Sequence, residues 1–354
     1  MAKTSFKDTR QQSAQLLRSL EGGKYSPVYL LMGDEPYHID LISDYIAENV
    51  LPDEAKAFNQ VILYGKDVDG AAVTNQARRY PVMSSHQVVI VRQAQNMSGI
   101  DNLIHYLASP SPSTILVLSY QGKSMDRRLA VFKKINEAGT VLESVAPRDY
   151  EVGGWITDTV GSRGIGIDPE AVQMIADHVG ADLKKIVNEL EKLFTRLPVD
   201  LKTITADHIE QNIGISKEYN NFELTKALSG RDIKQALMIA DHFAANPKDN
   251  PLMVTIAVLF NHFQRIVTLN ISRWEHKREN KPMASEQEIA KLLGLSHAFF
   301  VSEYLTASAN YPNSKAFPIL GLLREWDMKS KGMDSGSADQ GQLLKELILR
   351  ISMV

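Results

Sequence analysis

The sequence contains no cysteine, which excludes disulfides, thiolate metal sites and a cysteine nucleophile. It also contains no stretch approaching eighteen uncharged apolar residues, and its first fifteen residues lack the apolar core of a signal peptide. We therefore expect a cytoplasmic protein that does not contact a membrane.

An excess of positive charge is also missing, since 39 basic residues face 42 acidic ones. Tight autonomous DNA binding needs several Lys or Arg side chains to neutralise phosphates. Any DNA contact made by this chain alone is therefore expected to be weak. The length of 354 residues predicts two or three domains.

The first 146 residues alternate between β-rich runs and helical patterns. The β-rich runs are 28–32, 61–64, 88–91, 115–119 and 141–145, and the helical patterns lie near 37–50, 70–80, 100–108 and 126–138. Apolar strands separated by helices are typical of a largely parallel sheet that is covered on both faces. Residues 1–146 are therefore predicted to form an α/β domain.

The β signal ends at Val145, and Pro147 marks a predicted domain boundary. Residues 147–215 indicate a small helical domain, in which Asp168 and Pro169 form a helix start. Residues 216–354 indicate a helical bundle, with an exposed loop at 329–340 and a last helix at about 342–352.

The first predicted strand leads into a turn that resembles a phosphate-binding loop only in position. The segment 33–40 reads GDEPYHID, with two carboxylates and no Lys, so it favours a helix cap over a triphosphate site. The later Gly122-Lys123-Ser124 lacks the required first glycine. The strand at 88–91 is followed by Arg92 rather than by the acidic residues that hold Mg²⁺. We expect no ATPase activity.

Other enzyme motifs are also missing from the sequence, including HExxH, GxSxG and the EF-hand loop. His262 lies beside an apolar stripe, where a packed or hydrogen-bonded histidine is the usual case. We therefore predict no catalytic residues, no metal site and no cofactor.

Residues 285–308 offer an alternative function. Ser285 and Glu288 form a predicted capping box, and Gly294 supplies a sharp turn before a second helix, as in a helix-turn-helix DNA reader. No Lys or Arg occurs between Lys291 and Lys315, so the second helix cannot contact phosphates as such readers do. A packed helical hairpin is the favoured interpretation.

One apolar segment lies in a polar turn. Tyr80, Pro81, Val82 and Met83 stand between an amphipathic helix and the 88–91 strand, and Pro81 is expected to end that helix. From local sequence, the pair Val82 and Met83 either tucks under the sheet, which is the favoured reading, or protrudes as an anchor for a partner.

Six segments in order resemble the delta subunit family of the bacterial DNA polymerase III clamp loader. They are YLLMGDEPYHID, YPVMSSHQVVIVRQA, IDPEAVQMIADHVGADLKKIVNELEKL, FELTKAL, HFQRIV and EIAKLLGL, and they span nearly the whole chain. The resemblance implies a RecA/AAA+-like domain, a small helical lid domain and an all-α collar domain, without ATPase activity.

The resemblance also implies a role and partners in DNA replication. Members of the family bind and open the sliding clamp (beta) for loading onto primed DNA, together with the ATP-binding gamma/tau subunits and the delta-prime subunit. An apolar pair, commonly Leu-Phe, enters a clamp pocket; here the pair aligns as Val82 and Met83, with Pro81 and Tyr80 beside it. The chain would thus be a noncatalytic subunit of a nucleotidyltransferase complex.

Overall fold

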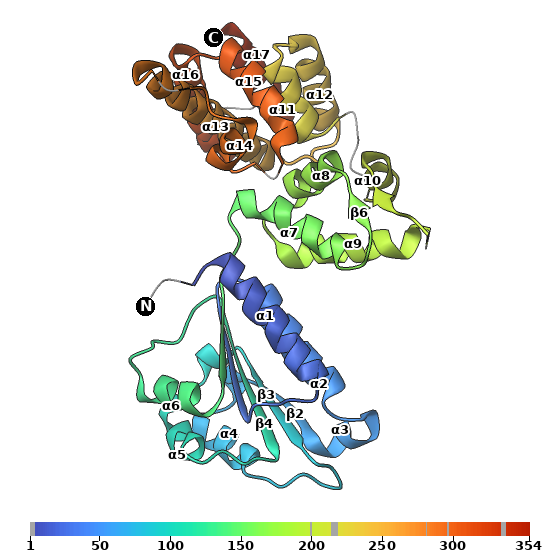
Figure 1. Ribbon diagram of the computed structural model, residues 1–354, viewed down its shortest axis with the longest axis vertical. Helices are drawn as coiled ribbons and strands as arrows, with labels where there is room; N and C mark the ends of the chain where they lie inside the picture. The colour runs from blue at the N-terminus through green and yellow to red at the C-terminus, as the bar shows by residue number, and fades with distance from the viewer. Residues whose placement is uncertain (1–3, 199, 214–218, 281, 296, 334–337) are drawn as a thin grey trace. The chain divides into compact units, whose positions relative to one another are not determined.

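The computed structural model describes residues 4–198, 200–213, 219–280, 282–295, 297–333 and 338–354. The chain divides into two compact units, Met1–Pro147 and Arg148–Val354 (Figure 1). The further division into three domains, with boundaries at 146/147 and 215/216, stays a prediction.

The first unit is built on a five-stranded sheet in the order β2-β3-β4-β1-β5, and every neighbouring pair is parallel. The strands are β1 (Val28–Gly33), β2 (Gln60–Tyr64), β3 (Gln87–Arg92), β4 (Thr114–Gln121) and β5 (Thr140–Ser144). The three central strands are buried almost throughout, as expected for a parallel sheet covered on both faces. The predicted α/β sheet is confirmed.

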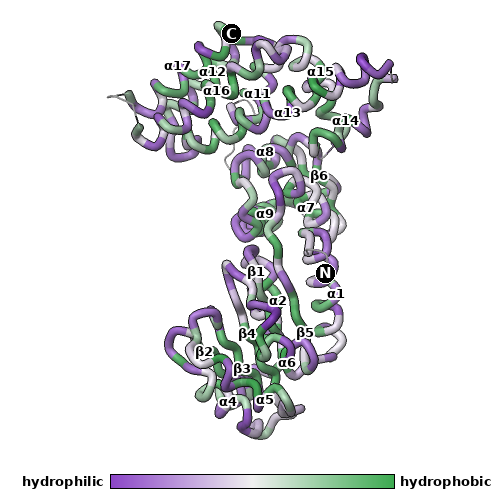
Figure 2. The backbone as a smooth tube through the Cα atoms, turned by 90° about the vertical axis from the view of Figure 1, so that its left-hand side faces the viewer, coloured by the Kyte–Doolittle hydropathy of each residue, from purple (hydrophilic) through white to green (hydrophobic). Residues whose placement is uncertain are grey.

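Helices cover both faces of this sheet, and residues alternate along each strand to meet them (Figure 1). On one face, Tyr29 and Leu31 pack with side chains of α1 (Phe6–Glu21) and α2 (Pro36–Asn49). The other face is covered by α4 (Gly70–Ala77), η3 (Ile100–Leu103), α5 (Ile104–Leu107) and α6 (Ala130–Ala138). Figure 2 shows hydrophobic segments running through the sheet.

Two helices of this unit, α1 and α3 (Asp53–Asn59), were not predicted from the sequence. Both bury few apolar side chains, so neither shows a clear apolar stripe. The unit also contains two short 3-10 helices, η1 (Gly65–Asp67) and η2 (Ala94–Asn96).

One predicted helix starts later than its pattern indicated. The expected helix at 126–138 begins at Ala130, because the Asp126 carboxylate accepts the N–H of Arg128 at 2.9 Å and forms a turn there.

The second unit begins with four helices and a short parallel strand pair. The elements are α7 (Asp149–Gly161), β6 (Gly166–Ile167), α8 (Pro169–Val179), α9 (Leu183–Arg196), β7 (Thr203–Ile204) and α10 (Ala206–Ile213). The predicted start of α8 is confirmed, with Asp168 at the N-cap and Pro169 at the first helical position. The strand pair is too short to show a pattern in sequence.

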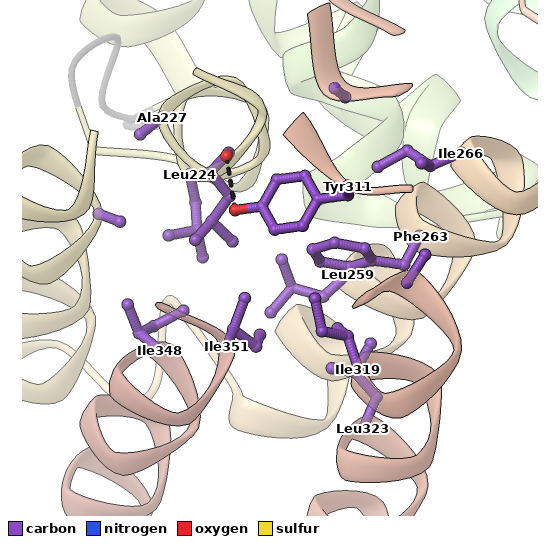
Figure 3. Close-up of a cluster of buried hydrophobic side chains, with 14 of the residues drawn as sticks. Leu224, Ala227, Leu259, Phe263, Ile266, Tyr311, Ile319, Leu323, Ile348 and Ile351 are labelled. Atoms are coloured by element: carbon purple, nitrogen blue, oxygen red, sulfur yellow. Dashed lines mark hydrogen bonds between the residues drawn. The ribbon is translucent and has the colours of Figure 1, made fainter. Parts of the chain in front are cut away.

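The remaining helices form one apolar core. They are α11 (Asn221–Ser229), α12 (Ile233–Ala245), α13 (Leu252–Arg278), α14 (Glu286–Leu293), η4 (Ala298–Phe300), α15 (Val301–Asn310), α16 (Asn313–Ser330) and α17 (Gln340–Met353). Figure 3 shows Tyr311 at the centre, where its hydroxyl donates to the carbonyl oxygen of Leu228 at 2.9 Å. The loop predicted at 329–340 overlaps the last two residues of α16 and the first residue of α17, and its residues 334–337 are outside the described ones.

Helix α13 is the one helix in the described part of the chain that is long and apolar enough to span a membrane. Half of its most apolar window is buried inside the unit. Leu259, Phe263 and Ile266 of α13 belong to the apolar core, as in the central helix of a helical bundle.

Candidate partner-binding site

The clearest surface feature of the sheet unit is the 80–83 loop, which joins α4 to β3. The side chain of Tyr80 is 86% exposed, that of Val82 is 54% exposed and that of Met83 is 102% exposed, while Pro81 is half-buried. Single exposed apolar residues are common, whereas three within four residues form a local apolar patch at the surface. Val82 and Met83 therefore protrude, and the interpretation that they tuck under the sheet is wrong.

Buried hydrogen bonds fix the base of this loop. The Gln87 side-chain nitrogen donates to the carbonyl oxygens of Ala77 and Arg79, and the Thr114 hydroxyl donates to Ala77 at 2.8 Å. These bonds satisfy the carbonyl of the last α4 residue. The helix consequently ends at Ala77, four residues before the proline that was expected to end it.

A second set of bonds ties the loop to helix α3. The Asn59 side-chain oxygen accepts the N–H of Val82 at 2.6 Å, and its nitrogen donates to the Val82 carbonyl oxygen at 3.0 Å. Asn59 itself is buried, whereas Phe58, the preceding residue, is 75% exposed.

Met83 adopts a left-handed backbone conformation, with φ of 53°. This conformation costs a non-glycine residue about 1–2 kcal/mol, and strain of this kind persists only where neighbouring contacts enforce it. The Met83 side chain makes no compensating buried contact, because it is fully exposed.

The turn after β1 stands where a phosphate-binding loop would lie, but its backbone groups bond to other atoms of the chain. Glu35 is buried, and its carboxylate accepts the N–H of Tyr37 at 2.8 Å at the start of α2. Gly33 donates to the carbonyl of Lys123 at 3.2 Å. The predicted helix cap is confirmed, and the amide of Tyr37 that a phosphate could bind already has a carboxylate partner.

Two other positions that would serve nucleotide binding or hydrolysis are also engaged with side chains of the chain itself. The Ser124 hydroxyl donates to Glu143 at 3.2 Å instead of standing in a phosphate-binding loop. At the end of β3, Arg92 forms an ion pair with Asp44 at 2.8 Å where a nucleotide-hydrolysing protein would place acidic residues.

The helix-turn-helix alternative finds no support in the structure. The predicted capping box at Ser285 and Glu288 is present, and Gly294 is left-handed with φ of 62°. The second helix, α15, buries Val301, Tyr304 and Ala307 in the core of the helical unit. It therefore contributes to packing, and its exposed face has no basic side chain.

The helical unit contains a cavity of about 380 Å³, lined by both apolar and titratable side chains, that the sequence did not reveal. His262 is buried, as predicted, and its Nε2 lies 2.9 Å from the Ser229 hydroxyl; burial and nearby Arg265 lower its pKa to about 3. Burial raises the pKa of the Glu303 carboxyl to about 7, although Ser229 donates to it at 3.1 Å. Burial likewise raises the pKa of Asp177 to about 7.

No group of three or more metal-ligating side chains occurs within the described residues. The residues that sequence reasoning missed at the surface site are Phe58 and Asn59. Asn59 is 23 positions from its partner Val82, so no local pattern could have joined them.

The fold and the site together define a class of protein. Its first unit is a parallel α/β unit with the strand–helix order of a nucleotide-binding domain, in which a carboxylate caps the turn after the first strand and an apolar loop is exposed. A helical unit follows. The family model described as DNA polymerase III, delta subunit, matches residues 29–145. DNA polymerase III subunit delta of Bacillus subtilis (strain 168) is 25% identical over 342 residues, which cover 94% of each chain.

Among solved structures, the Bacillus subtilis DNA clamp loader delta protein matches with a TM-score of 0.57 and 22% identity, covering 97% of this chain and 100% of that one. That structural likeness supports the fold. These matches confirm the predicted resemblance to the DNA polymerase III delta-subunit family: the family model covers residues 29–145, and the likeness to the Bacillus subtilis protein covers 94% of the chain.

Proposed function

We propose that the chain is the delta subunit of a bacterial clamp loader and that its 80–83 loop binds and opens the sliding clamp. The observation that carries this proposal is the exposure of Tyr80, Val82 and Met83 at the position where the family has its apolar pair. The resemblance over the rest of the chain supports the same role in DNA replication.

In this proposal the three predicted domains have separate tasks. Residues 1–146 form the AAA+-like domain that binds the clamp, 147–215 form the lid and 216–354 form the collar that joins the other subunits. The partners are the ATP-binding gamma/tau subunits, the delta-prime subunit and, through the assembled complex, primed DNA. The site of action is the cytoplasm.

This chain contributes binding energy rather than phosphoryl transfer. Burying Val82 and Met83 in a clamp pocket supplies about 3–5 kcal/mol before the costs of association. A ligand shifts an equilibrium only through unequal affinity for the two states. The 80–83 loop therefore opens the ring by binding the distorted clamp interface more tightly than the closed one.

ATP binding and hydrolysis belong to the neighbouring subunits in this mechanism. The Glu35 cap and the ion pair of Arg92 support a noncatalytic role for this chain. No cofactor or metal takes part in its own contribution.

Calorimetry with the sliding clamp of the same species, without ATP or DNA, tests the proposal. We expect a 1:1 complex, and Met83→Ala should weaken it at least about tenfold, equivalent to about 1.4 kcal/mol. Met353→Ala is the matched control, since Met353 is 78% exposed on α17. Equal affinity of Met83→Ala and the control would reject the site.

A further inference from the structure

The contact between Asn59 and Val82 pairs one side chain with both backbone polar groups of one residue. The Asn59 carboxamide binds both the N–H and the carbonyl oxygen of Val82, as a neighbouring strand would. Its second N–H donates to the carbonyl oxygen of Ala55 at 3.0 Å, one turn back in α3. The position of the Val82 backbone is thereby set by helix α3, 23 residues away in the sequence.

Asn59 is 3% exposed, so its bonds are shielded from water. A buried carboxamide that loses a partner leaves an unsatisfied polar group, which makes the pairing strongly preferred over a free loop. Both the N–H and the carbonyl oxygen of Val82 are held, and the next residue, Met83, is in a left-handed conformation. Strain held by surrounding contacts at an exposed residue is a feature of preorganised sites.

Preorganisation matters because ordering a loop on binding weakens the complex. A loop held in its bound shape before contact loses less conformational entropy and binds more tightly with the same side chains. The Asn59 bonds give the 80–83 loop this property, although Asn59 itself is too buried to touch a partner.

The same link brings a second exposed residue to the site. Phe58 precedes Asn59 and is 75% exposed, and Asn59 contacts Val82 directly. Phe58 and Val82 thus belong to two segments that Asn59 holds in direct contact. Aromatic anchors near the centre of a contact contribute a large share of binding energy.

We infer that Asn59 is a positioning residue that holds the 80–83 loop in its clamp-binding shape, and that Phe58 extends the docking surface onto α3. This inference rests on the proposed function of the loop. The partner it commits to is the sliding clamp, and its contact surface is an apolar patch made of Phe58, Tyr80, Val82 and Met83.

The test measures clamp affinity of full-length variants by calorimetry. We expect Asn59→Ala and Phe58→Ala each to weaken binding about tenfold. Asn49→Ala is the matched control for Asn59, because Asn49 is an exposed asparagine. Its side chain donates to the carbonyl oxygen of Tyr45 in the same helix. The control should bind as wild type does.

A double variant separates positioning from general destabilisation. Once Met83→Ala has removed the anchor, adding Asn59→Ala should weaken binding less than about threefold, because the two act through the same contact. Hydrogen exchange adds a direct readout: the Val82 amide should exchange faster in Asn59→Ala, while the amides of β3 keep their protection.

Three other outcomes of these binding measurements would each contradict the inference. If Met83→Ala weakens binding but Asn59→Ala does not, the positioning role is wrong while the proposed function stands. If Asn59→Ala weakens binding equally with and without Met83, it acts elsewhere. If Met83→Ala itself has no effect, the proposed site and the positioning role both fall.

If Asn59→Ala does not fold, Asn59→Asp tests the positioning role of Asn59 instead. The aspartate keeps an oxygen for the Val82 N–H but sets its second oxygen against the carbonyl oxygens of Val82 and Ala55, so a loss of at least about tenfold is expected. Wild-type affinity of a folded Asn59→Asp would contradict the positioning role. Similarly, wild-type affinity of Phe58→Ala would remove Phe58 from the surface.

Discussion

Met83 combines a left-handed backbone with a fully exposed apolar side chain, and folding alone favours neither property. Each lowers the stability or solubility of the free protein. Both are accounted for when a partner covers the side chain, since the strained backbone then holds the anchor in place.

Met83→Asn should separate these two properties. Asparagine tolerates the left-handed region better than methionine, so the free energy of unfolding should rise by about 0.5 kcal/mol. Clamp binding should fall at least about tenfold because the apolar anchor is gone. Thermal unfolding and calorimetric titration measure the two effects.

Met83→Leu is the control for this change, since it keeps an apolar side chain at the same position. It should bind the clamp within about threefold of wild type. Full affinity of Met83→Asn would show that the side chain is not the anchor.

Glu303 makes the stability of the helical unit depend on pH. Its folded pKa of about 7 lies above the ordinary 4.5, so its contribution is fully present below pH 4.5 and is lost as pH rises through 7. Glu303→Gln should therefore increase the free energy of unfolding at pH 8 by about 1–2 kcal/mol and change it little at pH 5.

Denaturant unfolding at the two pH values checks this expectation. Glu54→Gln is the control, because Glu54 is exposed on α3 and should show little difference between pH 5 and pH 8. A Glu303→Gln variant with the same effect at both pH values would contradict the assignment.

At the scale of elements, the β1–α2 turn depends on close backbone approach. A Cβ atom at Gly33 would stand 1.9 Å from the carbonyl oxygen of Ser144, and the φ of Gly33 is 135°. Glycine is therefore required by the contact between the turn and the end of β5, independently of any phosphate.

Gly33→Ala should lower the free energy of unfolding by about 3 kcal/mol or more. Gly122→Ala provides a matched comparison, because Gly122 also has a positive φ but no atom within 4 Å of an added Cβ, and should cost about 1 kcal/mol. Equal losses measured by denaturant unfolding would show that the close approach to Ser144 is unimportant.

The sequence was most informative about elements that bury a continuous apolar run or stripe. The three central strands follow from their buried apolar runs, and the two edge strands, β2 and β5, follow from short runs rich in Val, Ile and Leu although they are less buried. The cap at Glu35 follows from its carboxylate beside a helix start. Helices α1 and α3 were missed because the buried face of α1 mixes the polar Thr9 and Ser13 with Phe6 and Leu20, and because α3 buries only Asn59.

The candidate site was only partly predictable for a related reason. The resemblance selected Val82 and Met83, whereas local sequence favoured a tucked pair. The loop and its base are bonded to Asn59, Gln87 and Thr114, and these contacts join separate parts of the chain. Such contacts have no periodic signal, so they become visible only in the folded structure.

At the scale of the whole molecule, the chain combines two units with different chemistry. The sheet unit carries the exposed apolar loop, and the helical unit carries the large apolar core and the cavity that contains Asp177, His262 and Glu303. In the proposed function, the first binds the clamp while the second joins the chain to its loader neighbours, so variants of the 80–83 loop should leave loader assembly intact.

Clamp release from circular DNA tests the central claim most directly. Clamps are loaded onto nicked circular DNA, the purified chain is added without ATP, and clamp remaining on the DNA is measured over time. The account predicts release well above the spontaneous rate with wild type and near the spontaneous rate with Met83→Ala. Release that wild type does not accelerate, or that Met83→Ala accelerates equally, would contradict ring opening by the 80–83 loop.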